Sequence, residues 1–342
     1  MFEIPNWPYF TGAPGAEGLV RSCPEDFVVE EIPRVLPSGE GNHRWLWIEK
    51  RSANTDWIAR ELAKASGCLQ RDVGYAGLKD RHAVTRQWFS IPANAATDQR
   101  LEETRIEGAK ILEIHRHERK LKRGTLNGNR FNLKIRQFNG SQAKTEQCIN
   151  QIRSNGVPNY FGPQRFGHGG KNVAEGFSLL VKRVRLPRSK TSIYLSAIRS
   201  FLFNQVLAQR VERADWNTII DGELAMLNGT QSIFRCDKTD ANIEDRCRRL
   251  DIHPTGPLPG AGGTQPGGEV AQMEHAVLRN WPELTELLIA QRLQASRRSL
   301  RLCPAELESD IVGGTLELSF VLPPGAYATT VLREILVDKG AQ

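Results

Sequence analysis

The sequence lacks any pair of cysteines separated by two residues, which excludes a zinc knuckle of the CxxC type and a thioredoxin-like redox motif. The first residues lack the cationic start and the following apolar segment of an export signal. The cysteines are single and scattered, at Cys23, Cys68, Cys148, Cys236, Cys247 and Cys303. We therefore expect reduced thiols in a cytoplasmic protein.

Long apolar runs and nucleotide-binding loops are also missing. No stretch approaches the ~20 apolar residues that are needed to cross a bilayer. The pair Gly170-Lys171 lacks the glycine that a phosphate-binding loop has five residues earlier, since Arg165 stands there, and no Ser or Thr follows the lysine. The sequence therefore predicts neither a membrane-spanning protein nor a P-loop enzyme.

Positive charge is present in excess and is concentrated in three runs. The chain has 342 residues, enough for one large core or two, and a net charge of +7. Residues 115–136 alone hold eight Arg or Lys and one acid. Residues 182–190 and 297–301 are two further basic runs. Each run by itself is typical of a solvated face, and together they fit a surface that follows phosphates.

Residues 74–88 are the stretch around which the rest of the chain is interpreted. The first part is rich in glycine, and residues 84–91 have the β-branched and aromatic content of a strand, so Asp80 lies where a loop enters a strand. Lys79 and Arg81 flank Asp80 directly. An ionised carboxylate in a basic loop can act as a nucleophile or base on a polyanion. Local chemistry alone favours the alternative, a surface turn with solvated charges.

Periodicity and turn residues predict the other elements. Strands are expected at residues 26–32, 44–49, 110–115 and 315–322, and helices from Thr55 or Asp56 to Ser66 and at residues 192–214, 239–250, 270–278, 282–296 and 327–337. Asn127-Gly128 predicts a tight turn. Phe131, Leu133 and Ile135 then alternate with polar residues, which indicates a half-buried strand with Phe131 in the core.

Two glycine-rich segments predict irregular structure. Residues 157–172 combine glycines with Tyr160, Phe161 and Phe166 beside Gln164 and Arg165. Such a mixture suits an unstacked RNA base, and a packed loop between domains has the same composition. Residues 253–268 hold six glycines and four prolines, and we expect an irregular or mobile loop there.

Five segments in order resemble the TruD family of tRNA pseudouridine synthases. The first is GLKDRHAVT at residues 77–85, whose aspartate, Asp80 here, is the catalytic residue of that family. The others are PEDFVV at 24–29, LNGNRF at 126–131, VPNYFGPQRFG at 157–167 and LPPGAYAT at 322–329. The resemblance thus covers nearly the whole chain.

The resemblance implies an α+β fold. A pseudouridine-synthase catalytic domain with a mixed, largely antiparallel sheet and helices, residues 1–155 and 305–342, would be interrupted by a mainly helical insertion domain, residues 156–304. It also implies a substrate, tRNA, modified at uridine 13 of the D arm in the cleft between the domains. We expect no cofactor, because the isomerisation involves no net redox change, phosphoryl transfer or hydrolysis. We also expect a monomer that acts without a protein partner or a membrane.

The same resemblance implies the residues that contact the substrate. Phe27, Asn129 and Tyr327 match the substrate-contacting positions of the family, with Tyr327 replacing the more usual phenylalanine and keeping a ring that can stack. The remaining expected contacts are Phe131, Arg165, Lys79 and Arg21. Lys79 could instead bind a phosphate. Arg21 matches a basic family position and could pair with Asp80.

Two functions of other classes stay open. One is an RNA-binding protein that keeps the fold without catalysis, for which an altered Asp80 loop would be a sign. The other is a hydrolase of the glycosidic bond, which needs two carboxylates at one sugar, such as Asp26 and Asp80. Asp26 directly precedes Phe27 in a predicted strand, where neighbouring side chains point to opposite faces. The side chain of Asp26 is therefore expected to point to the face opposite Phe27.

Overall fold

The computed structural model describes residues 3–94, 96, 98–236 and 241–340. Their contacts divide the chain into two compact units, which are treated separately. The sheet unit comprises Gly15–Thr145, Pro304–Gly325 and Leu336–Gln342, and the helical unit comprises Met1–Pro14, Glu146–Cys303 and Ala326–Ile335. Within the described ranges, no helix is both long enough and apolar enough to cross a membrane.

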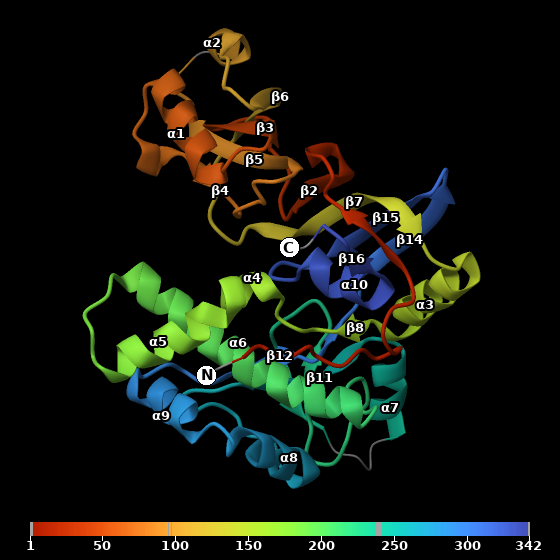
Figure 1. The fold of residues 1–342 in the computed structure, drawn as a ribbon. Coiled ribbons are helices and arrows are strands. Elements are labelled where there is room, and N and C mark those ends of the chain that lie inside the picture. The colour runs from red at the N-terminus through yellow and green to blue at the C-terminus, as the bar shows by residue number, and fades with distance from the viewer. Residues whose placement is uncertain (1–2, 95, 97, 237–240, 341–342) are drawn as a thin grey trace. The chain divides into compact units, whose positions relative to one another are not determined.

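The sheet unit is built on a mixed sheet of ten strands (Figure 1). Its main path runs β14-β15-β7-β2-β5-β3-β6; β1 pairs with β7 and β16, and β4 pairs with β5. The pairs β2/β5 and β1/β16 are parallel, and the other pairs are antiparallel. The strands are β1 (Glu17–Val20), β2 (Phe27–Pro33), β3 (His43–Arg51), β4 (Gly74–Tyr75), β5 (Val84–Pro92), β6 (Ala109–His117), β7 (Leu126–Asn139), β14 (Ala305–Val312), β15 (Thr315–Leu322) and β16 (Val337–Asp338).

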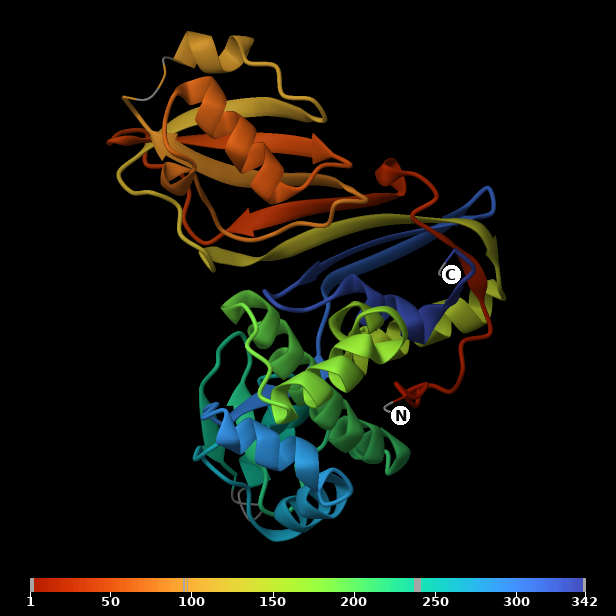
Figure 2. The same ribbon diagram turned by 60° about the vertical axis from the view of Figure 1, so that its left-hand side comes forward.

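One face of this sheet carries helix α1 (Thr55–Ser66), as Figure 2 shows. Its apolar stripe, with Ile58 and Leu62, packs on Leu46 and Phe89 of the sheet, and all four side chains are fully buried. Gly67 ends the helix in the left-handed conformation that a glycine adopts without strain. The short helices of this unit are η1 (Pro24–Asp26), η2 (Gln70–Asp72) and α2 (Asp98–Glu103), and α3 (Gln142–Asn155) begins in it.

The helical unit surrounds the long helix α6 (Arg188–Glu212), beside which α5 (Lys171–Val181) and β11 (Ile252–Leu258) run (Figure 1). Phe201, Leu202 and Leu207 of α6 are fully buried in its core. Strands β10 (Ile233–Arg235), β9 (Leu224–Leu227), β11 and β12 (Ser296–Ser299) form a second sheet, in that order. The remaining elements are β8 (Val157–Pro158), β13 (Arg301–Leu302), α4 (Pro163–Phe166), η3 (His168–Gly170), α7 (Ala241–Arg248), α8 (Gly268–Leu278), α9 (Pro282–Ala290) and α10 (Ala328–Ile335).

The α+β class with a mixed, largely antiparallel sheet is confirmed, and most predicted elements lie within a few residues of observed ones. Helix α1 begins at Thr55, but its N-cap position is Asn54 and no side chain caps it. The expected start of the helix at residues 239–240 lies outside the described residues. Strands β1, β4, β8 to β14 and β16 and helices α2 to α5 were not predicted. Most of these strands have only two to four residues, and β14 has a mostly exposed, polar face.

The predicted turn at Asn127-Gly128 is wrong, because both residues lie inside the continuous strand β7. Gly128 pairs with Ile32 of β2, and a Cβ at this position would lie 2.5 Å from the carbonyl oxygen of Leu322 in β15. The glycine therefore serves a close approach of two backbones in the sheet and makes no turn.

Two other boundaries were also wrong. Residues 253–268 are irregular only in their second part, because Pro254 and Pro257 belong to β11, where prolines still accept hydrogen bonds such as that from Leu300 N to Pro254 O, 2.9 Å. The helix expected at residues 282–296 ends at Ala290, since Ala295 N donates to Ala261 O and Ser296 begins β12. Tertiary pairing decides both cases.

Candidate active site

Asp80 lies on the loop that joins β4 to β5 in the sheet unit, where the sequence placed it. Its side chain is 56% exposed, and its Oδ2 accepts a hydrogen bond of 3.0 Å from Nη2 of Arg21. Arg21 follows β1 and has a φ of 62°, a left-handed conformation that is costly for a residue other than glycine and is found at functional sites. The predicted pairing of Arg21 with Asp80 is thus present.

Buried polar side chains hold the main chain of the Asp80 loop through hydrogen bonds. Gln87 Nε2 in β5 donates to the carbonyl oxygen of Gly77 over 3.0 Å. Thr55 Oγ1 at the start of α1 accepts from the amide of Lys79 and lies 3.1 Å from Gln87 Oε1, to which it donates. Lys50 Nζ in β3 donates to the carbonyl oxygen of Asp80 over 2.8 Å. The backbone of the loop is therefore fixed at three successive points, and the carboxylate of Asp80 faces solvent.

Lys79 points into the sheet and away from solvent. Its side chain is 4% exposed, and its Nζ lies 3.0 Å from Glu31 Oε2 and 2.5 Å from Asn129 Oδ1. Burial raises the pKa of Glu31, although the ammonium of Lys79 opposes this rise. The alternative in which Lys79 contacts a phosphate does not fit this buried arrangement. Because an ammonium only donates hydrogen bonds, Lys79 also sets the orientation of the Asn129 amide.

Phe27 and Phe131 form the aromatic part of this site. The two rings meet edge to face with centroids 6.1 Å apart, and both are buried. The guanidinium of Arg21 covers Phe27, with Cζ 3.8 Å from the ring centroid. A base can stack on the ring of Phe27 only after Arg21 moves aside. Phe131 also stacks on Phe320 of β15, so its expected place in the core is confirmed.

Tyr327 and Arg165 contact each other within the helical unit. Nη2 of Arg165 donates to the hydroxyl oxygen of Tyr327 over 2.6 Å, and Nη1 donates to Ser196 Oγ over 3.0 Å. The Tyr327 ring is partly buried against the core around α6. Phe161, close to Arg165, is buried under the guanidinium of Arg298. Of the two interpretations of residues 157–172, the packed one fits, since Tyr160, Phe161 and Phe166 are all buried. The expected irregular structure is wrong in part, because the segment includes β8, α4 and η3.

The six expected site residues of the sheet unit come together around one loop: Arg21, Phe27, Lys79, Asp80, Asn129 and Phe131. Sequence reasoning missed Glu31, Lys50, Thr55 and Gln87, which hold that loop. One signal was available, because Lys50 continues the alternation of Leu46 and Ile48, which face the core. A hollow of about 810 Å³ lies beside the loop and is lined in part by Arg51, Arg60 and Arg81.

The second carboxylate that a hydrolase would need is already engaged. Asp26 is fully buried, and both its oxygens accept hydrogen bonds from Arg136, at 2.9 and 2.8 Å. It therefore stabilises the start of β2 and does not share a sugar-binding position with Asp80.

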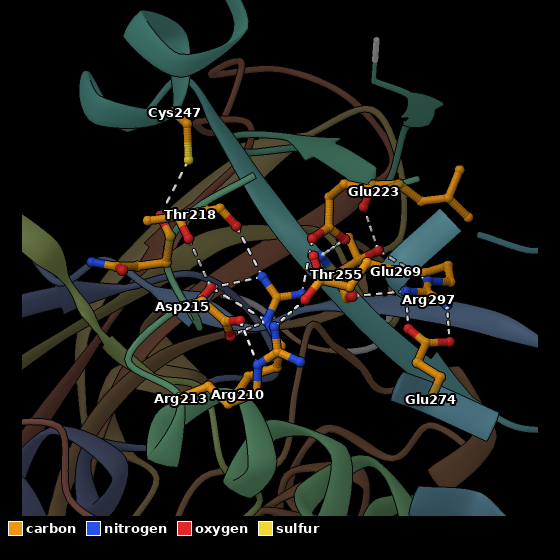
Figure 3. A network of polar contacts seen from close by, with 12 residues as sticks. Arg210, Arg213, Asp215, Thr218, Glu223, Cys247, Thr255, Glu269, Glu274 and Arg297 are labelled. Atoms are coloured by element: carbon orange, nitrogen blue, oxygen red, sulfur yellow. Dashed lines mark hydrogen bonds and ion pairs between the residues drawn. The ribbon is translucent and has the colours of Figure 1, made fainter. Parts of the chain in front are cut away.

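The basic runs differ in exposure. Residues 182–185 are exposed in the helical unit, and Arg119 and Lys122 are exposed in the sheet unit. The run at 297–301 does not fit a phosphate-contacting surface, because Arg297 and Arg301 are buried. Figure 3 shows Arg297 joined to Glu274, with Nη2 and Oε1 2.6 Å apart, and to Thr255. A neighbouring buried pair, Arg210 and Glu223, belongs to the same network.

Comparison with known proteins identifies the family. Residues 5–185 and 180–335 match the family model described as tRNA pseudouridine synthase D (TruD). A tRNA pseudouridine synthase D from Methylococcus capsulatus is 45% identical over 98% of this chain and 97% of its own length, and one from Chromohalobacter salexigens is 44% identical over 97% and 96%.

A solved structure has the same fold as this chain. The crystal structure of a putative tRNA pseudouridine synthase D from Methanosarcina mazei superimposes with a TM-score of 0.77 at 22% identity and covers 96% of each chain. With the family model and the relatives spanning nearly the whole sequence, the chain belongs to the tRNA pseudouridine synthase D family.

Proposed function

We propose that this protein isomerises a uridine of tRNA to pseudouridine and that Asp80 is the catalytic carboxylate. Membership of the family supports the reaction class. The observation that carries the role of Asp80 is its geometry: an exposed carboxylate on a loop whose backbone is fixed by Lys50, Thr55 and Gln87. A rigid support of this kind keeps a reacting group in place without reorganisation during the reaction.

The reaction breaks the bond between N1 of uracil and C1′ of ribose and forms a bond between C5 and C1′. The hydrogen at C5 leaves as a proton, and N1 gains one. The uridine must leave its stack, because the reacting atoms are otherwise covered by neighbouring bases. In this proposal Asp80 attacks the sugar or the base or removes a ribose proton. Arg21 orients the carboxylate and moves off the ring of Phe27 when a base stacks there. Asn129 offers an amide to the base, and Phe27, Phe131, Arg165 and Tyr327 complete the substrate contacts.

The proposal extends to the target and the setting. By family resemblance the target is uridine 13 of the D arm, modified by a cytoplasmic monomer that acts on tRNA without a protein partner. Residues 1–155 with 305–342 form the catalytic domain and residues 156–304 the insertion domain. The chain does divide into a sheet unit and a helical unit, which supports two domains, although residues 1–14, 146–155 and 326–335 belong to the helical unit.

Replacement of Asp80 by asparagine tests the role of the carboxylate. Asp80→Asn keeps the size and a hydrogen-bond acceptor for Arg21 but removes the charge, so tRNA binding should survive while turnover is lost. Release of tritium from tRNA that contains 5-tritiated uridine measures turnover. The matched control is Asp310→Asn, at an exposed position of β14.

Four results have different meanings for the function. Wild-type protein that releases tritium while Asp80→Asn does not supports the proposal. An active Asp80→Asn variant refutes the catalytic role of Asp80. Wild-type protein that binds tRNA without turnover favours the RNA-binding alternative, and release of free uracil favours the hydrolase.

A further inference from the structure

Lys50 is a buried cation beside the Asp80 loop whose charge has no role in the chemistry proposed above. It lies near the end of β3, and its side chain is fully buried. Its Nζ donates to the carbonyl oxygens of Ala53 and Asp80, both at 2.8 Å. Among residues that the structure describes, no carboxylate forms an ion pair with it. The ammonium therefore satisfies two main-chain acceptors and keeps its charge beneath Asp80.

Such a group is costly to the fold. Burial lowers the pKa of Lys50 to about 8; the charge of Asp80 opposes this shift and that of Lys79 adds to it. The unfolded chain holds the proton to higher pH than the folded chain does, so the charged form of Lys50 lowers the stability of the folded protein at neutral pH. The two hydrogen bonds do not require a full charge, because a neutral amine also donates.

The ammonium of Lys50 contacts the main chain of Asp80 directly. Thr55 fixes the amide of Lys79 immediately before Asp80, and Lys50 fixes the carbonyl of Asp80 itself. Among the residues that the structure describes, only Arg21 holds the side chain of Asp80, through a partly exposed contact. The backbone that carries the carboxylate is thus fixed on both sides of its Cα, and Lys50 provides one of the two contacts.

We propose that Lys50 is a positioning residue for the isomerisation, which holds the backbone of Asp80 in place for the reaction and supplies a positive charge beneath its carboxylate. This inference rests on the proposed function. If Lys50 only tied two loop segments together, its loss would lower stability and tRNA affinity with no separate effect on the chemical step.

Single-turnover kinetics with saturating tRNA separate these roles. Lys50→Met removes the charge and both hydrogen bonds, and the rate constant should fall about 100-fold, as expected for a reacting group that is displaced by about 1 Å. The dissociation constant for tRNA should stay within about twofold, because Lys50 is buried and does not contact RNA. Lys50→Arg, which keeps a charged donor, should recover part of the rate.

The control is Lys64→Met, the same substitution at an exposed lysine of α1, which should keep the wild-type rate. A folded Lys50→Met variant with a wild-type rate overturns the proposal. Failure of the proposed function is distinguishable, since wild-type protein would then form no pseudouridine at all.

If Lys50→Met does not fold, the pH dependence of the wild-type rate decides. The charge beneath Asp80 is present below pH about 8 and is lost above it, so the rate should fall as the pH rises through this value. In Lys50→Arg the fall should move to higher pH, because a guanidinium stays charged. A wild-type rate that is constant through this range would then overturn the proposal.

Discussion

At the residue scale, the reactive groups of the site are supported by residues that carry no chemistry. Asp80 and Arg21 are partly exposed, whereas Lys50, Thr55 and Gln87 are buried beneath them. The exposed groups were identified by resemblance to a family motif. The buried ones act through main-chain hydrogen bonds of a loop, and a linear sequence does not show which side chain reaches which carbonyl group.

Glu334 gives a prediction for the pH dependence of stability. It is buried in α10, where Oε1 lies 2.5 Å from Nη1 of Arg333 and Oε2 accepts from Phe10 N over 3.2 Å. Burial raises its pKa to about 7, and Arg333 opposes the rise. The folded state holds this proton to higher pH than the unfolded state does. The resulting stabilisation is complete below the ordinary pKa of 4.5 and is lost as the pH rises through 7.

Glutamine imitates the protonated form of Glu334. The stability of Glu334→Gln relative to the wild type should therefore increase as the pH rises. Between about pH 5 and about pH 8, the difference in free energy of unfolding should change by about 2–3 kcal/mol in favour of the variant. Urea denaturation at the two pH values measures it. Glu286→Gln, at an exposed position of α9, should show no such change. An equal pH dependence for wild type and Glu334→Gln would contradict the assignment.

At the element scale, strand β7 joins the parts of the site in the sheet unit. It pairs with β2, β15 and β1, and it contributes Asn129, Phe131 and Arg136. Its early part was interpreted as a turn because Asn-Gly is a strong local signal. The sheet overrides that signal, since Gly128 pairs with β2, and Asn129 directly after it pairs with both β2 and β15.

Gly128→Ala tests the reason for the glycine in β7. The added Cβ would lie 2.5 Å from the carbonyl oxygen of Leu322, a backbone atom that cannot rotate away. We expect destabilisation of about 1–3 kcal/mol, as for other overpacked sites. Gly15→Ala, where the new methyl group meets nothing within 4 Å, should stay within about 0.5 kcal/mol. Equal thermal melts for the two variants would show that β7 and β15 adjust freely.

At the scale of the whole molecule, the net charge of +7 does not describe the surface available to RNA. Arg210, Arg297 and Arg301 are buried, and the first two are neutralised by Glu223 and Glu274 (Figure 3). The exposed cations at residues 182–185 have no carboxylate partner among the described residues. We expect this run to contribute to phosphate binding and the buried run to contribute to stability alone.

Charge reversal of Lys182, Arg183 and Arg185 to glutamate tests this expectation. If each cation binds one phosphate, the slope of log affinity for tRNA against log salt should become shallower by about 0.7–0.9 for each phosphate that is no longer bound. The control reverses Arg246, Arg248 and Arg249 of the α7 region, which changes the net charge by the same amount where Asp245 and Asp251 already pair with two of the arginines. Equal slopes for the two variants would show a general charge effect without local phosphate binding.

The sequence by itself determined the family, the fold class and the position of the Asp80 loop. It also located strands β2, β3, β5, β6, β7 and β15 and helices α1 and α6 to α10. These follow from local patterns. Apolar and polar residues alternate along β15, α1 has an apolar stripe and a glycine at its end, and the motif around Asp80 is contiguous in sequence. Such signals lie within a few residues of one another, and they do not depend on how the rest of the chain is arranged.

Only the tertiary structure decided which charges are buried and which glycines and prolines belong to strands. Arg297 and Lys182 lie in similar basic runs, and they differ because a distant glutamate, Glu274, faces one of them. Gly128 and Pro254 look like turn residues until the neighbouring strands are in place. The support of Asp80 by Lys50, 30 residues earlier, has the same cause. Burial and hydrogen bonding depend on partners that are remote in sequence, and those partners exist only in the folded chain.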